Sequence, residues 1–338
     1  MKPTLTVIVP VYNDSANLAV CYAALSRSTR PPDQVIVIDD GSSEPLPEPP
    51  ETLPVLQLRL PDGPQGSFVA RNRGVSRARG EILVFVDADV RVHKDALDRL
   101  VTYLCDHPSV AAVFGSYDDA PAAPHWVSRY KNLMHHYVHQ HAKREAASFW
   151  TGLGAIRRSA FDAVGGFSTN ARTVRDIDMG IRLAHAGHRV HVAPEIQGTH
   201  LKRWSFRKMI RSDILDRAIP WTRLIAHAGS LPDDLNLAVS SRWSAAFAWA
   251  GLVSLAAVPL WGPAVIACLL CLGAVALLNR ALWRFMAAHG GGLFAVGAFC
   301  LYTLYLLYSS ATFVVVFPLE RAKTLGDRSA PKQGGIWP

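Results

Sequence analysis

The amino-acid sequence predicts an α/β domain with a mostly parallel sheet and helices on both faces, followed by a C-terminal transmembrane helical region. Over the first 200 residues, short apolar runs rich in Val and Ile alternate with segments of helical length, which is typical of βαβ units. No residue is charged from 244 to 279 or from 290 to 319. Each of these runs exceeds the roughly 18 apolar residues that indicate a transmembrane helix.

The predicted elements follow from the spacing of apolar residues and from the turn residues between them. The expected strands are residues 5–13, 34–42 with its terminal turn, 55–60, 82–86, 110–115, 149–155 and 189–192. The expected helices are residues 15–28, 67–79, 94–107 and 176–186.

Composition and charge set limits on compartment and partners. The chain has 338 residues, a net charge of +8 and five cysteines, three of them in the apolar C-terminal part, so no disulfide framework is expected. The N-terminus lacks a signal-peptide pattern, and we therefore expect the first 240 residues to stay in the cytosol. The positive charge favours anionic partners such as phosphate substrates, acidic lipid or nucleic acid.

Two carboxylates, Asp87 and Asp89, follow the predicted strand at 82–86. The carboxyl ends of parallel strands open into the crevice where α/β sheets bind ligands. In an extended segment, side chains two residues apart lie on the same side. Both acids can then converge on one Mg²⁺ or Mn²⁺ together with substrate phosphates. The alternative is a strand-end turn whose acids cap the next helix.

Ordered motifs give a resemblance to a known family. Residues 6–13, 37–42, 70–74 and 86–89 read TVIVPVYN, VIDDGS, ARNRG and VDAD, and they resemble the successive signatures of family 2 glycosyltransferases. GGF at 165–167 and DIDMGIR at 176–182 resemble that family's acceptor-side motifs. The resemblance covers roughly residues 4–223. It implies a Rossmann-like GT-A fold, a nucleotide-diphosphate sugar donor, Mg²⁺ or Mn²⁺ and, as a rule, inversion at the anomeric carbon.

The same resemblance assigns the donor-binding residues. The base-binding positions fall on Pro10, Val11, Tyr12 and either Asp39 or Asp40. A carboxylate there can accept the N–H of a uracil ring, a readout that discriminates well because an unpaired buried acid is costly. Arg71 is expected to meet the donor phosphates through a bidentate contact. The alternative for the two carboxylates is that they cap a turn before Gly41.

The resemblance also assigns a metal centre. Asp89 is the expected direct ligand, while Asp87 reaches the donor ribose or a metal-bound water. The cation would neutralise charge that grows on the departing nucleoside diphosphate. His200 matches a position where some relatives supply a third ligand, and the alternative is that it is a structural histidine.

At the catalytic base the chain departs from the family pattern, because the family usually carries an acidic pair where this chain has Arg175 and Asp176. Asp176 aligns with the base that takes a proton from the acceptor hydroxyl, and Asp178 is the fallback. The alternative for Asp178 is an acid favoured by the helix dipole. Arg175 favours the ionised, weaker base, which suits an acceptor that is already ionised, such as a lipid phosphate.

We expect residues 1–200 to form the catalytic domain and 201–243 a basic amphipathic interfacial region. Residues 201–223 contain seven Lys or Arg and two Asp among large apolar residues, which is typical of a helix lying on an anionic membrane surface. In such a helix Phe206, Ile210 and Ile214 share the apolar face. Nucleic-acid binding is the alternative use of this patch, and the apolar region that follows favours lipid.

Transmembrane helices are expected over residues 244–319, followed by a polar tail at 320–338. The 36 residues from 244 to 279 would form a helix of about 54 Å, longer than the roughly 30 Å hydrocarbon core. Because prolines at 259 and 263 offer a break, we predict a hairpin at 244–279. A short interfacial helix at 280–289 and one span at about 292–317 follow. The side of the membrane that holds the tail stays open.

These features predict a multi-pass inner-membrane glycosyltransferase with its catalytic domain in the cytoplasm. It would move a sugar from a nucleotide donor, with a UDP-sugar favoured, to a lipid-linked or membrane-proximal acceptor of cell-envelope polysaccharide or glycolipid synthesis. Anionic lipid is an expected partner, and nucleic acid is not. One alternative is a sugar nucleotidyltransferase, which the lack of a Gly-rich phosphate loop after the first strand disfavours. The other is a catalytically silent membrane scaffold that binds nucleotide sugars.

Overall fold

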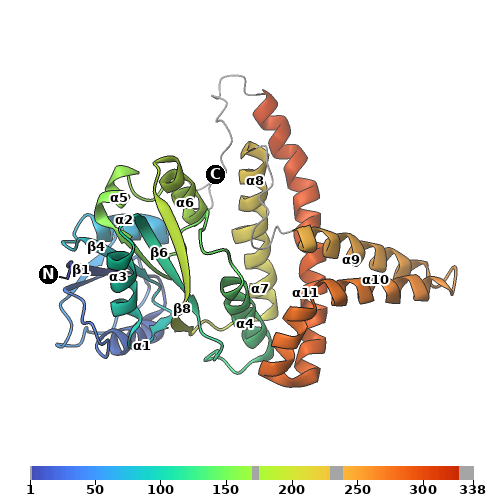
Figure 1. The fold of residues 1–338 in the computed structure, drawn as a ribbon, viewed down its shortest axis with the longest axis horizontal. Coiled ribbons are helices and arrows are strands. Elements are labelled where there is room, and N and C mark those ends of the chain that lie inside the picture. The colour runs from blue at the N-terminus through green and yellow to red at the C-terminus, as the bar shows by residue number, and fades with distance from the viewer. Residues whose placement is uncertain (1, 170–174, 229–238, 327–338) are drawn as a thin grey trace. The chain divides into compact units, whose positions relative to one another are not determined.

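The computed structural model describes residues 2–169, 175–228 and 239–326 (Figure 1). The chain divides into two compact units, the first comprising residues 1–124 and 139–203, and the second residues 125–138 and the chain from 204 onward. The predicted boundary at residue 200 lies close to this division. However, no sequence pattern indicated that residues 125–138 pack with the C-terminal helices.

The first unit is built on one eight-stranded sheet with strand order β3-β2-β1-β4-β7-β6-β8-β5. The strands are β1 (Leu5–Val11), β2 (Gln34–Asp39), β3 (Val55–Arg59), β4 (Ile82–Val86), β5 (Val90–Val92), β6 (Val110–Tyr117), β7 (Leu153–Arg157) and β8 (Arg189–His200). The order of the strands reverses direction at β1, so the carboxyl ends of β2, β1 and β4 open into a ligand-binding type of crevice.

Parallel strand pairs outnumber antiparallel ones, as predicted, although the sheet is mixed. Strands β1 to β4 form parallel pairs, as do β6 and β8. In contrast, β7 runs antiparallel to β4 and β6, and β5 runs antiparallel to β8. The antiparallel strands lie on the far side of β4 from β1, and they bring the end of β8 next to the segment that follows β4.

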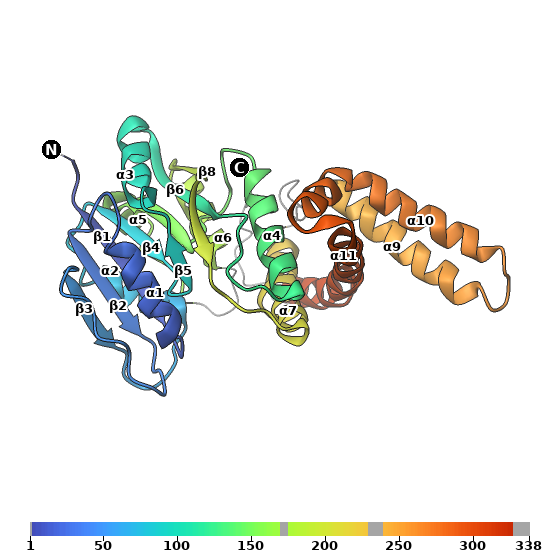
Figure 2. The same cartoon turned by 90° about the horizontal axis from the view of Figure 1, so that it is seen from below.

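Helices cover both faces of this sheet (Figure 2). They are α1 (Ser15–Leu25), α2 (Ser67–Val75), α3 (Ala96–Asp106), α5 (Arg158–Ala163) and α6 (Arg175–His185). Helices α1 and α3 contribute to the core on one face, and α2, α5 and α6 to the cores on the other. Strand β4 is buried throughout and alternates between these cores, which explains its unbroken apolar sequence.

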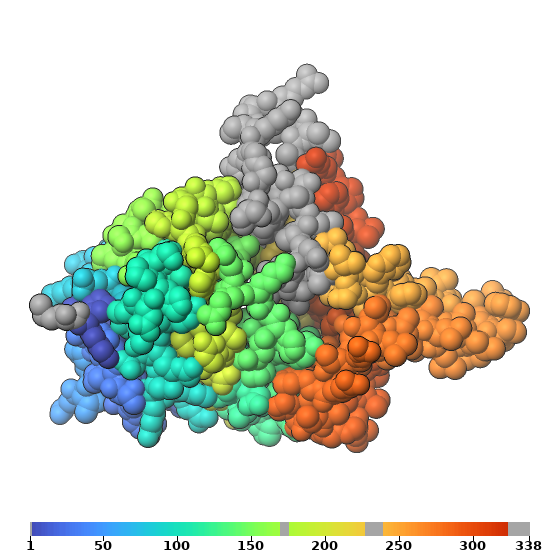
Figure 3. Space-filling view, in the orientation of Figure 1, coloured from blue at the N-terminus to red at the C-terminus, as the bar shows by residue number. Residues whose placement is uncertain are grey.

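The second unit is helical. Its elements are α4 (Trp126–Gln140), α7 (Phe206–Ser212), the π-helix η1 (Asp213–Ala218), α8 (Ile219–Ala228), α9 (Val239–Ala257), α10 (Ala264–Leu278) and α11 (Arg280–Gly326). The last two residues of α4 belong to the first unit. Helices α9 and α10 form the predicted hairpin, whose tip projects from the other helices of this unit (Figure 3). Among the described residues, one helix, Arg280–Lys323, is long and apolar enough to cross a membrane.

Gly291 divides α11, because its φ of +80° is not helical. The part before Gly291 corresponds to the predicted short interfacial helix, and the part after it contains the predicted span. The helix then continues through Pro318 to Gly326, so the first residues of the predicted polar tail are helical. Glu320 forms an ion pair with Arg223 of α8 at 3.3 Å, which ties this end of α11 to its neighbour. Residues 327–338 of the predicted tail lie outside the described part of the chain.

The buried side of the basic region differs from the predicted apolar face. On α7 and η1 the buried residues are Met209 and Asp213, at 1% and 2% exposed, whereas Phe206 is 47% exposed. Asp213 forms an ion pair with Lys131 of α4 and accepts a hydrogen bond from Tyr308 Oη at 2.7 Å. Packing against other helices of this unit determines the buried face, because Met209 joins their apolar core and Asp213 pairs with Lys131. Residues 229–238 of the predicted interfacial region are not among the described residues.

Candidate active site

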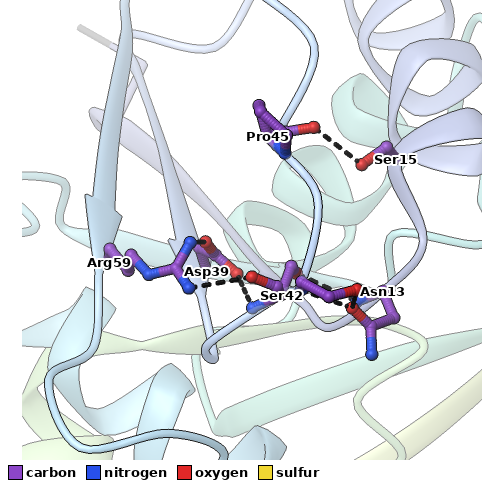
Figure 4. A network of polar contacts seen from close by, with 7 residues as sticks. Asn13, Ser15, Asp39, Ser42, Pro45 and Arg59 are labelled. Carbon is purple, nitrogen blue, oxygen red and sulfur yellow. Dashed lines mark hydrogen bonds and ion pairs between the residues drawn. The ribbon is translucent and has the colours of Figure 1, made fainter.

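The two acids at the end of β2 hold the loops around the crevice. Asp39 accepts hydrogen bonds from Ser42 N at 2.8 Å and from Arg59 Nη1 at 2.9 Å (Figure 4). Asp40 accepts from the N–H groups of Gln65 at 2.7 Å and Gly66 at 2.8 Å. Asp39 therefore caps the turn at Gly41, as the alternative expected, whereas Asp40 holds the loop that leads to α2. Each oxygen keeps further acceptor capacity, so contact with a nucleotide base stays a prediction.

The end of β1 is braced against the same loop. Asn13, with a φ of +50°, donates its N–H to Ser42 Oγ at 2.9 Å and accepts from Ser43 N at 2.8 Å through Oδ1 (Figure 4). Pro10 and Val11 are buried in the strand, whereas Tyr12 is 48% exposed. The predicted base-binding segment therefore has a fixed main chain and one accessible aromatic ring.

Arg71 lies buried on α2, only 3% exposed. Its Nη2 is 2.5 Å from Asp87 Oδ1, and its guanidinium lies 4.7 Å from the centre of the Phe68 ring. Its Nε and Nη1 are buried and have no hydrogen-bond partner among the described residues. Buried donors without a partner are costly, and an anion is the ligand that would satisfy them best. The predicted phosphate contact is consistent with this arrangement.

Asp87 and Asp89 lie in a tight turn and not in an extended strand, so the predicted geometry was wrong. Val90 N donates to Asp87 O at 3.0 Å, which closes the turn. The chain turns here because β4 ends at Val86 and β5 begins at Val90 to pair with β8. The sequence did not show this, because β5 has only three residues.

Pairing of β5 with β8 brings His200 to Asp89. Val90 is directly opposite His200 in the ladder, and Leu201 N donates to Asp89 O at 2.8 Å. His200 Nε2 then lies 3.5 Å from Asp89 Oδ2, with the side chains 5% and 15% exposed. The predicted ligands Asp89 and His200 therefore face each other, although they are 111 positions apart in the sequence.

The two acids of the turn have different electrostatic surroundings. Burial raises the pKa of Asp87, and the opposing effect of Arg71 does not cancel this. For Asp89, burial also acts to raise the pKa, but the hydrogen bond and charge of His200, together with Lys202, lower it overall. Asp89 is therefore the carboxylate that stays ionised more readily, as a direct cation ligand must.

The donor set suits a divalent cation that also binds substrate. One imidazole nitrogen and one carboxylate oxygen face each other, and a second carboxylate lies in the same turn. Within the described part of the chain, no group of three or more His, Cys, Asp or Glu could hold a metal ion. Mg²⁺ and Mn²⁺ commonly bind to one or two carboxylates plus substrate phosphates and water, so an incomplete protein set fits them.

The predicted base candidates lie at the start of α6. Asp176 is half-buried, and its main-chain carbonyl accepts from Phe149 N at 2.9 Å, which ties α6 to the segment before β7. Asp178 forms an ion pair with Arg182 Nη2 at 2.8 Å on the same helix. This contact favours a structural role for Asp178. The side chain of Arg175 lies outside the described part of the structure.

Three residues at the site were not predicted. Tyr117, at the end of β6, stacks on His200 with ring centroids 4.1 Å apart and an interplanar angle of 6°. Trp150 packs edge-on against Tyr117, with the ring centroids 4.8 Å apart. Asp118 is the residue after Tyr117. The sequence signal was the polar run Tyr-Asp-Asp at 117–119, directly after an apolar strand.

Comparison with known proteins shows which family the N-terminal part of the chain resembles. A family model described as Glycosyl transferase family 2 matches residues 6–165, from β1 to just past α5. The glycosyltransferase AglE of Haloferax volcanii is 27% identical over 208 residues, which is 60% of this chain and 68% of AglE. Residues 6–165 therefore match the family 2 glycosyltransferase model, and the named relative is a glycosyltransferase.

Solved structures give the fold of this glycosyltransferase. The mannosyltransferase PcManGT of Pyrobaculum calidifontis, in complex with GDP-Man and Mn²⁺, aligns with a TM-score of 0.52 and 19% identity over 90% of this chain and 88% of PcManGT. Residues 1–349 of S. aureus TarS, in complex with UDP-GlcNAc, align with a TM-score of 0.52 and 16% identity over 97% of this chain and 93% of that one. The glycosyltransferase has the predicted GT-A fold.

Proposed function

We propose that this enzyme transfers a sugar from a nucleotide-diphosphate donor, with a UDP-sugar favoured, to a lipid-linked or other membrane-proximal acceptor. The observation that carries the proposal is the meeting of Asp89 and His200 beside the ion pair of Asp87 with the buried Arg71. An ionised carboxylate, an imidazole and a guanidinium with unsatisfied donors suit a metal-bound diphosphate. The reaction is a metal-assisted displacement with inversion at the anomeric carbon.

The residues divide the chemistry between them. Asp89 and His200 would hold Mg²⁺ or Mn²⁺, with Asp87 reaching the ribose or a metal-bound water, and the cation would supply Lewis-acid stabilisation of the diphosphate leaving group. Arg71 orients the phosphates with its free N–H groups. Asp176 takes the proton from the acceptor hydroxyl as the hydroxyl oxygen attacks the anomeric carbon. The bond from that carbon to the diphosphate oxygen breaks, and the nucleoside diphosphate leaves.

The structural neighbours support a nucleotide-sugar donor, since one is in complex with GDP-Man and Mn²⁺ and the other with UDP-GlcNAc. The nucleotide bases of these two ligands differ, since one is a GDP-sugar and the other a UDP-sugar. We favour uracil because Asp39 and Asp40 present carboxylate oxygens that can accept its N–H, next to the exposed ring of Tyr12.

A membrane-proximal acceptor is supported by the second unit. The apolar helix Arg280–Lys323 is a candidate span, and exposed basic residues precede it on α7. They are Arg207, Lys208 and Arg211. Such a cluster is attracted to anionic lipid. We place the enzyme at the inner membrane with its catalytic domain in the cytoplasm.

The test is a transfer assay with the full chain in nanodiscs that contain anionic membrane lipid. A panel of nucleotide sugars is added with Mn²⁺, and both sugar-labelled lipid and free nucleotide are measured. Labelled lipid together with a nucleoside diphosphate is the expected result. Pyrophosphate as the product would indicate a sugar nucleotidyltransferase, and bound donor without turnover would indicate a silent scaffold.

A further inference from the structure

A single carboxylate joins three strand ends next to the metal centre. Asp118 follows β6, and its Oδ2 accepts hydrogen bonds from His93 Nε2 at 2.9 Å and from Thr199 Oγ1. Its own N–H donates to Gly198 O at 3.0 Å. His93 directly follows β5, and Thr199 directly precedes His200 in β8. Asp118 therefore ties the ends of β5, β6 and β8 together. It also holds Thr199, the residue before His200.

The neighbouring side chain fixes the His200 ring itself. Tyr117 and His200 are each 5% exposed, and their rings lie almost parallel at a centroid distance of 4.1 Å. Trp150 supports Tyr117, with the two rings nearly perpendicular at 4.8 Å. The imidazole is therefore held on one face by an aromatic ring that is itself buried and supported, while Nε2 is directed toward Asp89.

We propose that Tyr117 and Asp118 are positioning residues for the metal centre. Neither has to touch the cation. Tyr117 fixes the plane of the His200 ring and Asp118 fixes its main chain, so that Nε2 meets the cation bound by Asp89 without reorganisation. This inference rests on the proposed function, because it requires His200 to be a ligand. Groups that orient a ligating histidine commonly change metal affinity by about 10–100-fold when they are removed.

A role in folding alone would give a different result. If the two residues only hold the sheet together, their loss lowers stability and leaves the affinity of folded protein for the cation unchanged. The deciding readout is therefore Mn²⁺ affinity. It is measured by electron paramagnetic resonance of free Mn²⁺, on the full chain, alone and with UDP.

The main comparison is Tyr117→Leu against Tyr117→Phe. Leucine removes the flat ring face, and we expect Mn²⁺ affinity to fall by roughly ten-fold. Phenylalanine keeps the face and loses only the hydroxyl, so it should restore affinity to within about two-fold of wild type. Equal affinity in both variants and wild type overturns the inference for Tyr117.

The effect must act through His200. His200→Ala alone should weaken Mn²⁺ binding, and adding Tyr117→Leu to it should cause no further loss. Additive losses would contradict a positioning role. If wild type and His200→Ala bind Mn²⁺ equally, the metal role of His200 in the proposed function fails. If only Tyr117→Leu is without effect, the inference fails and the proposed function stands.

Thr199→Val tests Asp118 with a smaller change. Valine has nearly the shape of threonine but cannot donate to the Asp118 carboxylate, so the variant should fold even if Tyr117→Leu does not. We expect Mn²⁺ affinity to fall by about three-fold or more. This loss is smaller than that expected when a group in direct contact with the ligating histidine is removed. A variant that melts at a lower temperature but binds Mn²⁺ as wild type does would assign Asp118 to folding alone.

Discussion

At the residue scale, the two acids at the start of α6, Asp176 and Asp178, make different contacts. Asp178 is paired with Arg182 one turn further along α6, so its carboxylate already has a cationic partner. Asp176 lies in the first helical turn, where its main chain bonds to the segment leading to β7. The ion pair gives Asp178 a structural role, and Asp176 as the base is our proposal from its position in the motif.

Asp176→Asn should lower kcat by about 10²–10⁴-fold, because general-base catalysis commonly contributes that much. Asp178→Asn should lower it far less and mainly reduce stability. Both are measured as release of nucleoside diphosphate that depends on the acceptor. Full transfer by Asp176→Asn would remove the base role and would favour an acceptor that is ionised before it binds.

Arg71→Gln should weaken binding of UDP with Mn²⁺ by at least about ten-fold, since hydrogen bonds to charged groups contribute about 1.5–3 kcal/mol. Arg73→Gln is the matched control, because Arg73 is exposed on the same helix. Calorimetric titration of both variants checks this. Equal losses in the two variants would assign the effect to the charge of the helix and not to a direct phosphate contact.

At the element scale, the strands were predictable where apolar residues form an unbroken run. Strands β2 and β4 begin and end close to the expected positions, because burial on both faces requires every residue to be apolar. Strand β5 was not predictable, since its three residues are too few to show the alternating apolar pattern of a strand. Its absence from the prediction also hid the turn at Asp87 and the ladder that brings His200 to Asp89.

The contacts around Tyr117 were also beyond sequence reasoning. Tyr117 and His200 lie on neighbouring strands that are far apart in the chain, and no local pattern links them. The prediction identified His200 from its family position alone. The stacked Tyr117 ring and the Asp118 carboxylate support His200 only because of the strand order. That order could not be predicted from the sequence.

The bond between His93 and Asp118 should make stability depend on pH. The hydrogen bond to Asp118 raises the pKa of His93 above 6.5, and this effect outweighs burial. Burial acts to raise the pKa of Asp118, but His93 and Thr199 lower it below 3.8 overall. The His93 contribution is full below pH 6.5 and is lost as pH rises through the folded-state pKa. The Asp118 contribution is present above pH 3.8 and is lost on acidification below that value.

His93→Gln should therefore lower the melting temperature more at pH 5.5 than at pH 8.5. The effect will be small, because the His93 side chain is 40% exposed and solvent screens the pair. Differential scanning fluorimetry of the full chain at both pH values checks this. An equal decrease at both pH values would mean that the charge of His93 contributes nothing.

At the scale of the whole molecule, the chain combines a GT-A unit with a helical unit. The helical unit includes α4, whose Lys131 reaches Asp213 and whose Ser128 accepts from Trp204 N at 2.7 Å. A segment inserted in the catalytic sequence thus belongs to the unit that holds the candidate span. Hydropathy predicted that span, but it did not predict the participation of α4, because long-range packing alone reveals it.

The full chain should remain in the membrane pellet after alkaline carbonate extraction, because α11 offers an apolar stretch long enough to cross a bilayer. Detergent should then release it. Immunoblotting of pellet and supernatant measures the outcome, with a cytosolic enzyme and an established transmembrane protein as controls. Release by carbonate alone would mean that the helix lies at the surface and does not span.

The most direct test of the central claim is binding of UDP to the full chain with and without Mn²⁺, measured by calorimetry. The account predicts that wild type binds UDP with Mn²⁺ and that EDTA lowers the affinity by at least about ten-fold, or about 1.4 kcal/mol. Asp89→Asn should give the same loss with Mn²⁺ present. Asp95→Asn, a change at an exposed acid nearby, should bind as wild type does. UDP affinity that is unchanged by EDTA and by Asp89→Asn would contradict a metal centre at this turn.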